Sequence, residues 1–168
     1  ESRIASLKPE EIGYVRVNSL SQDGTPVKYI TEGTIVKVDL NKPLPPHSST
    51  VLKMDFSGQA PVMIRRTGRN NPDGVALSMT QWYPKLAEYD YRGWNTTEYI
   101  TREFYGVWGN YDVKITIDKD YIIGGSGYLQ NNNEIGFGYE DAGVKVPKVK
   151  GNKRTWHFYA PQVHDFAW

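Results

Sequence analysis

Apolar and polar residues alternate along five stretches of the chain. Side chains of valine, leucine, isoleucine, methionine or phenylalanine recur at every second position, with mostly polar or charged residues between them. The stretches are Val15 to Asn18, Val36 to Leu40, Leu52 to Phe56, Val75 to Thr80 and Val113 to Asp118. A period of two places the apolar side chains on one face of a half-buried antiparallel sheet. The pattern therefore predicts an all-β fold of mostly antiparallel strands.

Turn signals agree with this prediction, and helix signals are weak. Asp23-Gly24 and Gly151-Asn152 are pairs that accept the positive backbone φ angle of tight hairpins. Three prolines within residues 39–49 predict an extended connector. Single helical turns are expected at Lys8 to Ile12 and at Pro84 to Tyr89. We expect one domain over residues 1–168, with saddle-like or sandwich-like sheets and minimal helix.

Length, composition and charge narrow the function classes. A chain of 168 residues is long enough for one hydrophobic core. The formal charge is +1, and the densest basic stretch, Lys145 to Arg154, is interrupted by apolar residues and glycine, which is typical of a solvated hairpin. We therefore predict no nucleic-acid partner. No apolar run approaches the ~18 residues of a membrane span, so no membrane partner is predicted either.

Candidate metal ligands are few. The chain has no cysteine, which removes disulfides, thiolate metal sites and cysteine nucleophiles, and leaves the compartment open. The paired histidines of a helical zinc hydrolase are absent. His157, His164 and Asp165 would form a metal site only if the fold brought them together, and histidines at the surface or at the edge of the core explain them better. We predict no metal ligand in this chain.

Other catalytic arrangements are also unconvincing. The glycine-rich segment IIGGSGY (residues 122–128) lacks the Gly-x-Ser-x-Gly spacing of a nucleophile elbow, so we expect a strand that bends at its glycines. Glu88, Asp90, Glu98 and Glu103 are possible paired carboxylates for glycoside hydrolysis, but sequence separation does not place any two at working distance. We predict no catalytic residue and no cofactor within residues 1–168.

Three segments nevertheless follow one another in a characteristic order. They are MTQWYPKLAEYDYRGW (residues 79–94), YDVKITI (residues 111–117) and HDFAW (residues 164–168). In this order, over roughly Val75 to Trp168, the chain resembles the N-terminal β domain of zinc aminopeptidases of the aminopeptidase N and leukotriene A4 hydrolase family. It most resembles the bacterial branch, where QWYPKLAEYD replaces a cysteine-containing segment.

The resemblance implies a role for each end of this region. Residues Gln81, Trp82 and Tyr83 would belong to a loop that faces the substrate cleft. Asp165, Phe166 and Trp168 would contact a catalytic domain that follows Trp168. That domain would hold the zinc and the catalytic residues of the metallopeptidase, so residues 1–168 alone are expected to be an inactive cap that limits which peptide N-termini enter.

Two alternatives remain open at this stage. Exposed tryptophan and tyrosine rings on a β-sandwich would also suit a carbohydrate-binding module. An apolar patch at Phe166 and Trp168 would suit an interaction domain, which overlaps with the first interpretation. The exposure of the aromatic rings separates the cap domain from the carbohydrate-binding module, because a cap domain is expected to bury most of its aromatics. We expect Trp94, Trp108 and Trp156 to pack inside.

Overall fold

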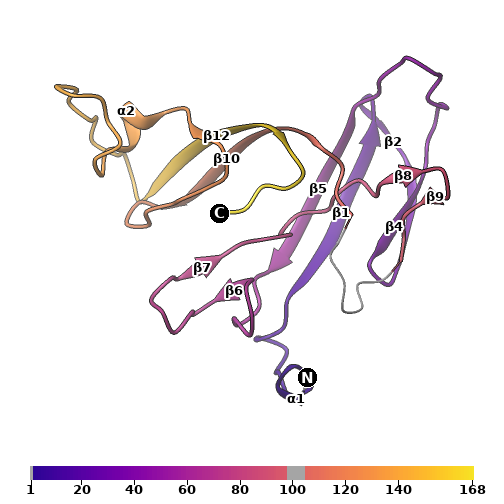
Figure 1. Cartoon of the computed structure of the whole chain (residues 1–168), viewed down its shortest axis with the longest axis horizontal. Coiled ribbons are helices and arrows are strands. Elements are labelled where there is room, and N and C mark those ends of the chain that lie inside the picture. The colour runs from indigo at the N-terminus through magenta and orange to yellow at the C-terminus, as the bar shows by residue number, and fades with distance from the viewer. Residues whose placement is uncertain (1, 98–104) are drawn as a thin grey trace.

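The structure is a computed structural model that describes residues 2–97 and 105–168 (Figure 1). Its elements in chain order are α1 (Ser2–Ala5), β1 (Tyr14–Gln22), β2 (Thr25–Pro26), β3 (Lys28–Glu32), β4 (Ile35–Asp39), β5 (Leu52–Gln59), β6 (Gly68–Arg69), β7 (Leu77–Ser78), β8 (Tyr89–Asp90), β9 (Gly93–Trp94), β10 (Gly109–Asp118), β11 (Tyr128–Leu129), α2 (Asn132–Ile135) and β12 (Lys153–Val163). All pairings between these strands are antiparallel, and each helix has 4 residues. The prediction of an all-β fold is confirmed.

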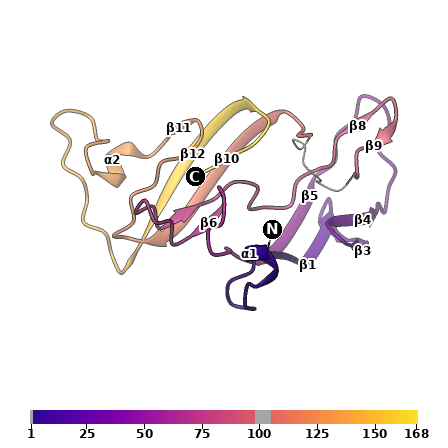
Figure 2. The same cartoon turned by 60° about the horizontal axis from the view of Figure 1, so that its bottom comes forward.

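The strands form small sheets rather than one large one. Two sheets have three strands, in the orders β2-β1-β5 and β10-β12-β11, and three two-stranded sheets pair β3 with β4, β6 with β7, and β8 with β9. Figures 1 and 2 show the β10-β12-β11 sheet and α2 toward one end of the molecule, with β1, β5 and the β3–β4 hairpin toward the other.

The hydrophobic core lies against the long strand β12. Trp156, Phe158 and Ala160 occupy alternate positions of this strand and are almost completely buried. The rings of Trp156 and Phe158 are stacked, with centroids 6.3 Å apart. Ile115 of β10 and Phe166 join the same cluster. The strict alternation of buried residues on β12 explains why this sheet has one dry face.

The β1–β5 ribbon is much less covered. Most of its side chains are exposed or half-buried, and Leu20 and Gln22 are its buried residues. Gln22 tolerates burial because its side-chain amide is satisfied at both ends: Nε2 donates to the carbonyl of Lys42 (3.0 Å), and Oε1 accepts from the Lys42 backbone N–H (3.1 Å). The connector after β4 is thereby tied to the end of β1.

Several local predictions are confirmed. Asp23 and Gly24 both have positive φ angles, 47° and 84°, in the turn between β1 and β2. Residues 40–51 contain no strand, as expected for the proline-rich connector. Near the N-terminus, the backbone N–H groups of Glu11 and Ile12 both donate to the carbonyl of Lys8, which forms the expected single helical turn.

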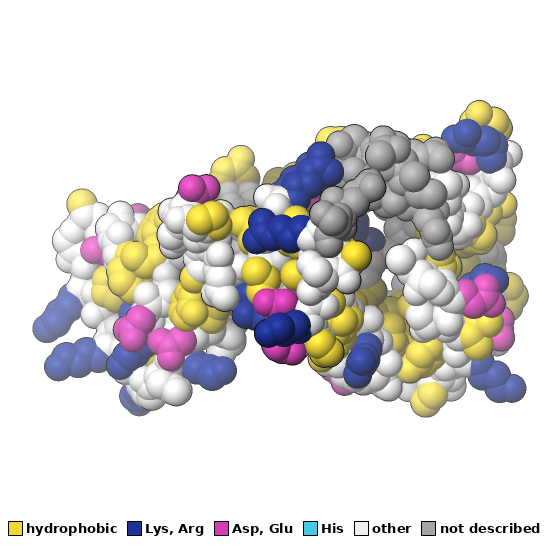
Figure 3. Space-filling view, turned by 90° about the horizontal axis from the view of Figure 1, so that it is seen from below, with side chains coloured by type: hydrophobic (Ala, Val, Ile, Leu, Met, Phe, Trp, Pro, Cys, Tyr) yellow, Lys and Arg dark blue, Asp and Glu magenta, His cyan; other side chains and the backbone are white. Residues whose placement is uncertain are grey.

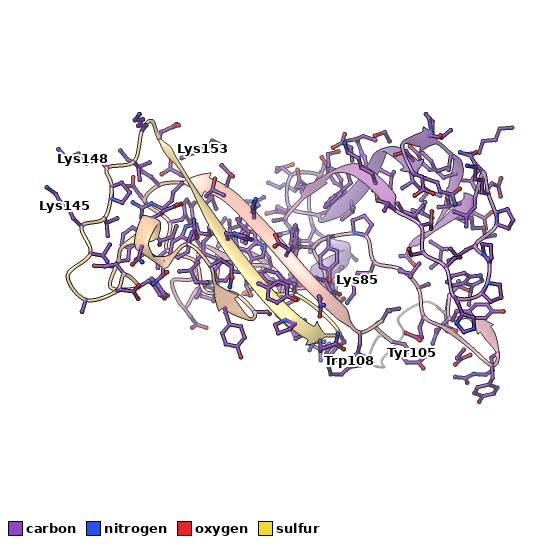
Figure 4. The ribbon with its side chains drawn as sticks, turned by 90° about the horizontal axis from the view of Figure 1, so that it is seen from above. Lys85, Tyr105, Trp108, Lys145, Lys148 and Lys153 are labelled. Carbon is purple, nitrogen blue, oxygen red and sulfur yellow. The ribbon has the colours of Figure 1, made fainter. Side chains whose placement is uncertain are left out.

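Three local predictions are wrong. Residues 84–89 form no helical turn, because Ala87 bridges to Gly106 and Tyr89 begins β8. The alternation at residues 75–80 yields only the two-residue strand β7. The basic stretch before Gly151 is a loop and not half of a hairpin: Lys145 and Lys148 are exposed there, at the end of the molecule farthest from Trp108 (Figure 4).

Candidate functional site

The loop that contains Gln81 and the segment 165–168 lie together, although more than eighty residues separate them in the sequence. Met79 and Trp168 exchange two backbone hydrogen bonds, from the N–H of Met79 to the carbonyl of Trp168 (2.8 Å) and back (3.1 Å). The indole Nε1 of Trp82 donates to the carbonyl of Phe166 at 3.1 Å. We call this contact region, formed by Met79, Trp82, Tyr83 and Ser126 around residues 165–168, the clasp.

Aromatic packing reinforces the clasp. The ring of Trp82 meets that of Trp168 edge to face, with centroids 6.3 Å apart, and meets that of Tyr83 at 5.1 Å. Trp82 and Trp168 are half-buried and pack against the core cluster. Such edge-to-face pairs contribute about 0.5–1.5 kcal/mol beyond the area they bury. Most of the Trp82 ring therefore packs against neighbouring rings, and its indole N–H is hydrogen-bonded within the same chain.

A half-buried ion pair between Lys85 and Asp165 also belongs to the clasp. Oδ1 of Asp165 accepts from the hydroxyl of Tyr83 (2.9 Å), from Nζ of Lys85 (3.1 Å) and from the backbone N–H of Phe166 (2.9 Å). The side chains of Lys85 and Asp165 are only 18% and 14% exposed. Lys85 also donates to the carbonyl of His164 at 3.2 Å. These bonds compensate the cost of removing both charges from water.

The environment of Tyr83 raises the pKa of its hydroxyl well above the usual value of a tyrosine. Burial is the largest cause, because it disfavours the phenolate, and the hydrogen-bonding partners Tyr111 and Asp165 add to it. The negative charge of Asp165 opposes ionisation as well. Tyr83 therefore acts as a neutral hydrogen-bond donor, with no tendency toward base or nucleophile chemistry.

The glycine-rich segment holds the clasp from a third side. The backbone N–H of Ser126 donates to the carbonyl of Ala167 (2.9 Å), and the N–H of Ala167 donates to Oγ of Ser126 (3.1 Å). Gly127 follows with φ of 78°, and a Cβ atom there would lie 2.3 Å from the carbonyl oxygen of Tyr159 on β12. Glycine is thus required for the close approach. The segment is a loop before β11, and not the bent strand expected from its sequence.

Gln81 differs from its neighbours because its side chain is exposed. Its φ angle is 53°, in the left-handed region that residues other than glycine seldom adopt. Gln81 lines a groove of about 430 Å³ together with Ile4, Leu7, Ile12, Gly13, Pro61, Val62, Ile64, Arg65, Arg66 and Thr67. The groove combines apolar walls with two arginines and the amide of Gln81.

The structure therefore divides the six site residues that were predicted from the sequence. The side chain of Gln81 lines a groove. Trp82 and Tyr83 instead donate hydrogen bonds to the segment that contains Asp165. Phe166 is 0% exposed and belongs to this chain's own core, so the expectation of an exposed apolar patch at Phe166 is corrected. The ring is buried because Tyr111 and Phe158 pack against it, at centroid distances of 6.4 and 6.0 Å.

The histidines and carboxylates of the described residues do not gather into a metal site. Within residues 2–97 and 105–168, no group of three or more His, Asp or Glu side chains is arranged to hold an ion. His157 Nε2 lies 3.0 Å from Asp112 Oδ1, and His164 packs against Trp108. Glu98 and Glu103 lie outside the described residues. Among the described residues, His157 and His164 therefore take part in two separate contacts.

Two tryptophans that were expected to pack inside are largely exposed. Trp94 is 58% and Trp108 is 65% exposed, while Trp156 is completely buried as expected. Trp94 lies on the two-stranded β8–β9 hairpin, where the edge-to-face contact with Tyr89 (centroids 5.0 Å apart) is its ring contact. Trp108 precedes β10, and its ring meets that of His164 with centroids 5.4 Å apart.

Sequence reasoning missed Met79, Lys85 and Ser126 as parts of the clasp. Met79 acts through backbone groups, which any residue type would supply, and Ser126 acts through both its backbone N–H and its hydroxyl. Lys85 was detectable as the only basic residue between Trp82 and Tyr91, but its carboxylate partner is far away in the sequence. Comparison with known proteins adds no assignment, because no family model, curated protein or solved structure matches the chain. Neither described helix is long enough to cross a membrane.

Proposed function

We propose that the chain is a non-catalytic N-terminal domain of a zinc-dependent aminopeptidase, which covers the active-site cleft and shapes the access of peptide N-termini. The sequence resemblance over Val75 to Trp168 motivates the proposal. The observation that supports it in the structure is the clasp, which joins the loop of Gln81 to the segment 165–168. In the proposal, the loop of Gln81 faces the substrate and the segment 165–168 leads to the catalytic domain.

The geometry around Gln81 suits a side chain that contacts a ligand. Met79 on one side is held by two backbone hydrogen bonds, and Trp82 on the other is held through its indole N–H. The backbone between them is fixed in a left-handed conformation that costs roughly 1–3 kcal/mol in a residue other than glycine. A polar side chain displayed from a rigid, strained loop is preorganised for contact, since little entropy is lost when it binds.

The proposal places the metal elsewhere. Zinc and the groups that activate water would belong to polypeptide that follows Trp168, and this chain would contribute shape and contacts. A cap of this kind limits which chain end reaches the reacting atoms and keeps bulk water away from them. The inferred full-length protein is then a metalloaminopeptidase, while residues 1–168 alone are inactive.

Two measurements test the proposal. The purified chain of 168 residues should release no reporter from an aminoacyl substrate and should retain no stoichiometric zinc after dialysis. Reading the coding sequence downstream of Trp168 should reveal a His-Glu-x-x-His segment. Hydrolysis by the isolated chain, or a downstream sequence without such ligands, would contradict the proposal.

A carbohydrate-binding function is the second candidate, and the β8–β9 hairpin favours it. Tyr89, Tyr91 and Trp94 are 63%, 91% and 58% exposed there, beside the ion pair of Asp90 and Arg92. However, the rings of Tyr89 and Trp94 meet at 70°, so they do not form the flat platform on which sugar rings stack. Titration of tryptophan fluorescence with oligosaccharides decides this. A saturable change that Trp94→Ala removes and Trp108→Ala leaves intact would favour the second candidate.

A further inference from the structure

Among the described residues, the backbone groups on the outer edge of β5 have no hydrogen-bond partner. β5 pairs with β1 on one side and is the last strand of its sheet. Within the described part of the chain, residues 52–59 make no backbone hydrogen bond except those to β1. The strand has eight residues, no proline and no covering helix. An edge of this length is a template for pairing with another strand.

The exposed surface of the whole chain is larger than that of a compact monomer of the same mass. The chain exposes 12440 Å², whereas a compact monomer of 19.1 kDa exposes about 8,400 Å². Side chains at the start of β5 take part in this excess, since Val51 and Leu52 are 68% and 43% exposed. Figure 3 shows hydrophobic side chains reaching the surface toward both ends of the molecule. The excess leaves room for the roughly 1,000–2,500 Å² that each partner buries in an obligate dimer.

The sequence of β5 is complementary to itself when read in reverse. We propose that two copies of this chain pair through their β5 edges, antiparallel and about a two-fold axis at Met54. In this register, Lys53 lies opposite Asp55 of the second copy, and Asp55 opposite its Lys53. Leu52 lies opposite Phe56 on the other face. The charged residues of the two copies therefore share one face of the joined sheet, and the apolar residues share the other face.

The charges favour this register over those with the axis one residue to either side. An axis at Lys53 would place Lys53 against itself, and an axis at Asp55 would place two carboxylates together. Like charges directly opposite each other are destabilising. An axis between two residues would turn the apolar face of one copy toward the polar face of the other. Lys53 and Asp55 are both exposed, and neither has an ion-pair partner among the described residues.

This pairing joins two three-stranded sheets into one of six strands, in the order β2-β1-β5-β5-β1-β2. An isologous contact of this kind closes on itself, so it yields a dimer and not a fibre. It also pairs the edge backbone groups of residues 52–56 in both copies, while residues 57–59 of each strand extend beyond the overlap. The inference is independent of the proposed function, because it uses only β5 and its neighbours.

Sedimentation equilibrium of the 168-residue chain tests the inference with charge variants. The wild-type chain should be a dimer at micromolar concentration. Lys53→Asp and Asp55→Lys should each raise the dimer dissociation constant by about tenfold or more, because each places like charges opposite one another. An equimolar mixture of the two variants should restore dimers, since each now complements the other. Lys145→Asp, in the distant exposed loop, is the matched control and should change nothing.

The outcome is decisive in either direction. Circular dichroism confirms that each variant is folded before its mass is measured. A wild-type chain that stays monomeric at 200 µM overturns the inference, and so does a dimer that neither single variant weakens. Failure of the mixed variants to associate overturns the register. Because catalysis and zinc are not measured, these results leave the proposed function untouched.

Discussion

The hydroxyl of Tyr83 and Oδ1 of Asp165 lie 2.9 Å apart and join a loop to a segment 82 residues further along the chain. Asp165 also accepts from Lys85 and from the backbone of Phe166, so loss of the hydroxyl alone leaves the carboxylate partly satisfied. Tyr83→Phe should therefore lower the free energy of unfolding by about 1 kcal/mol, the usual net value of one hydrogen bond. Urea denaturation measures it.

Tyr91→Phe is the control for that experiment. Tyr91 is 91% exposed, so removal of its hydroxyl should change the free energy of unfolding by less than about 0.5 kcal/mol. Equal effects in the two variants would show that the contact between Tyr83 and Asp165 does not stabilise the fold.

The raised pKa of Tyr83 predicts a loss of stability in alkaline solution. Below pH 10 the hydroxyl is protonated in both the folded and the unfolded chain, and its stabilisation is fully present. Above about pH 10, the usual tyrosine pKa, the unfolded chain loses this proton while the folded chain keeps it. Stability therefore falls as the pH rises further. The midpoint of urea unfolding, followed from pH 9 to 11.5, should fall less steeply in Tyr83→Phe than in the wild type or in Tyr91→Phe.

Gly127 should be among the positions least tolerant of a methyl group. Gly127→Ala would combine a φ angle of 78° with a Cβ atom 2.3 Å from the carbonyl oxygen of Tyr159. Gly138 also has a positive φ, 88°, but nothing lies within 4 Å of its added Cβ. We expect Gly138→Ala to cost about 1 kcal/mol for backbone strain alone, and Gly127→Ala to cost at least about 2 kcal/mol more. Thermal melting of both variants checks the difference.

Phe166→Ala should destabilise the chain as a core mutation does. The ring is completely buried against Phe158 and Tyr111, so its removal leaves a cavity and should cost about 3–5 kcal/mol. Leu86→Ala, at a position that is 62% exposed, should cost less than about 1 kcal/mol. A mild effect at Phe166 in urea denaturation would contradict its place in the core.

Four strands were predictable from the alternation of apolar and polar residues, whereas β12, with 11 residues, overlaps none of the five predicted stretches. β1, β4, β5 and β10 all overlap stretches of alternating residues, and burial of every second side chain is what that alternation encodes. The strands of β8 and β9 have two residues each, which is too short for any period to appear. At residues 84–89, the pairing of Tyr89 with Trp94 overrides a weak local preference for a helical turn.

The clasp was only partly predictable. The resemblance singled out Gln81, Trp82 and Tyr83 together with Asp165, Phe166 and Trp168, but residue types alone do not reveal that the two groups touch. The bond from Trp82 to Phe166 spans 84 positions, and no local signal records such a contact. The prediction that Trp94 and Trp108 are buried was wrong, because a large aromatic ring favours contacts at the surface as well as burial in a core.

The two backbone bonds between Met79 and Trp168 have a mechanical consequence. Both bonds must break before residue 168 can move away from Met79, and Gln81, which lines the groove, lies only two residues further along the chain. The wall of the groove at Gln81 is therefore positioned by a contact with a segment more than eighty residues away.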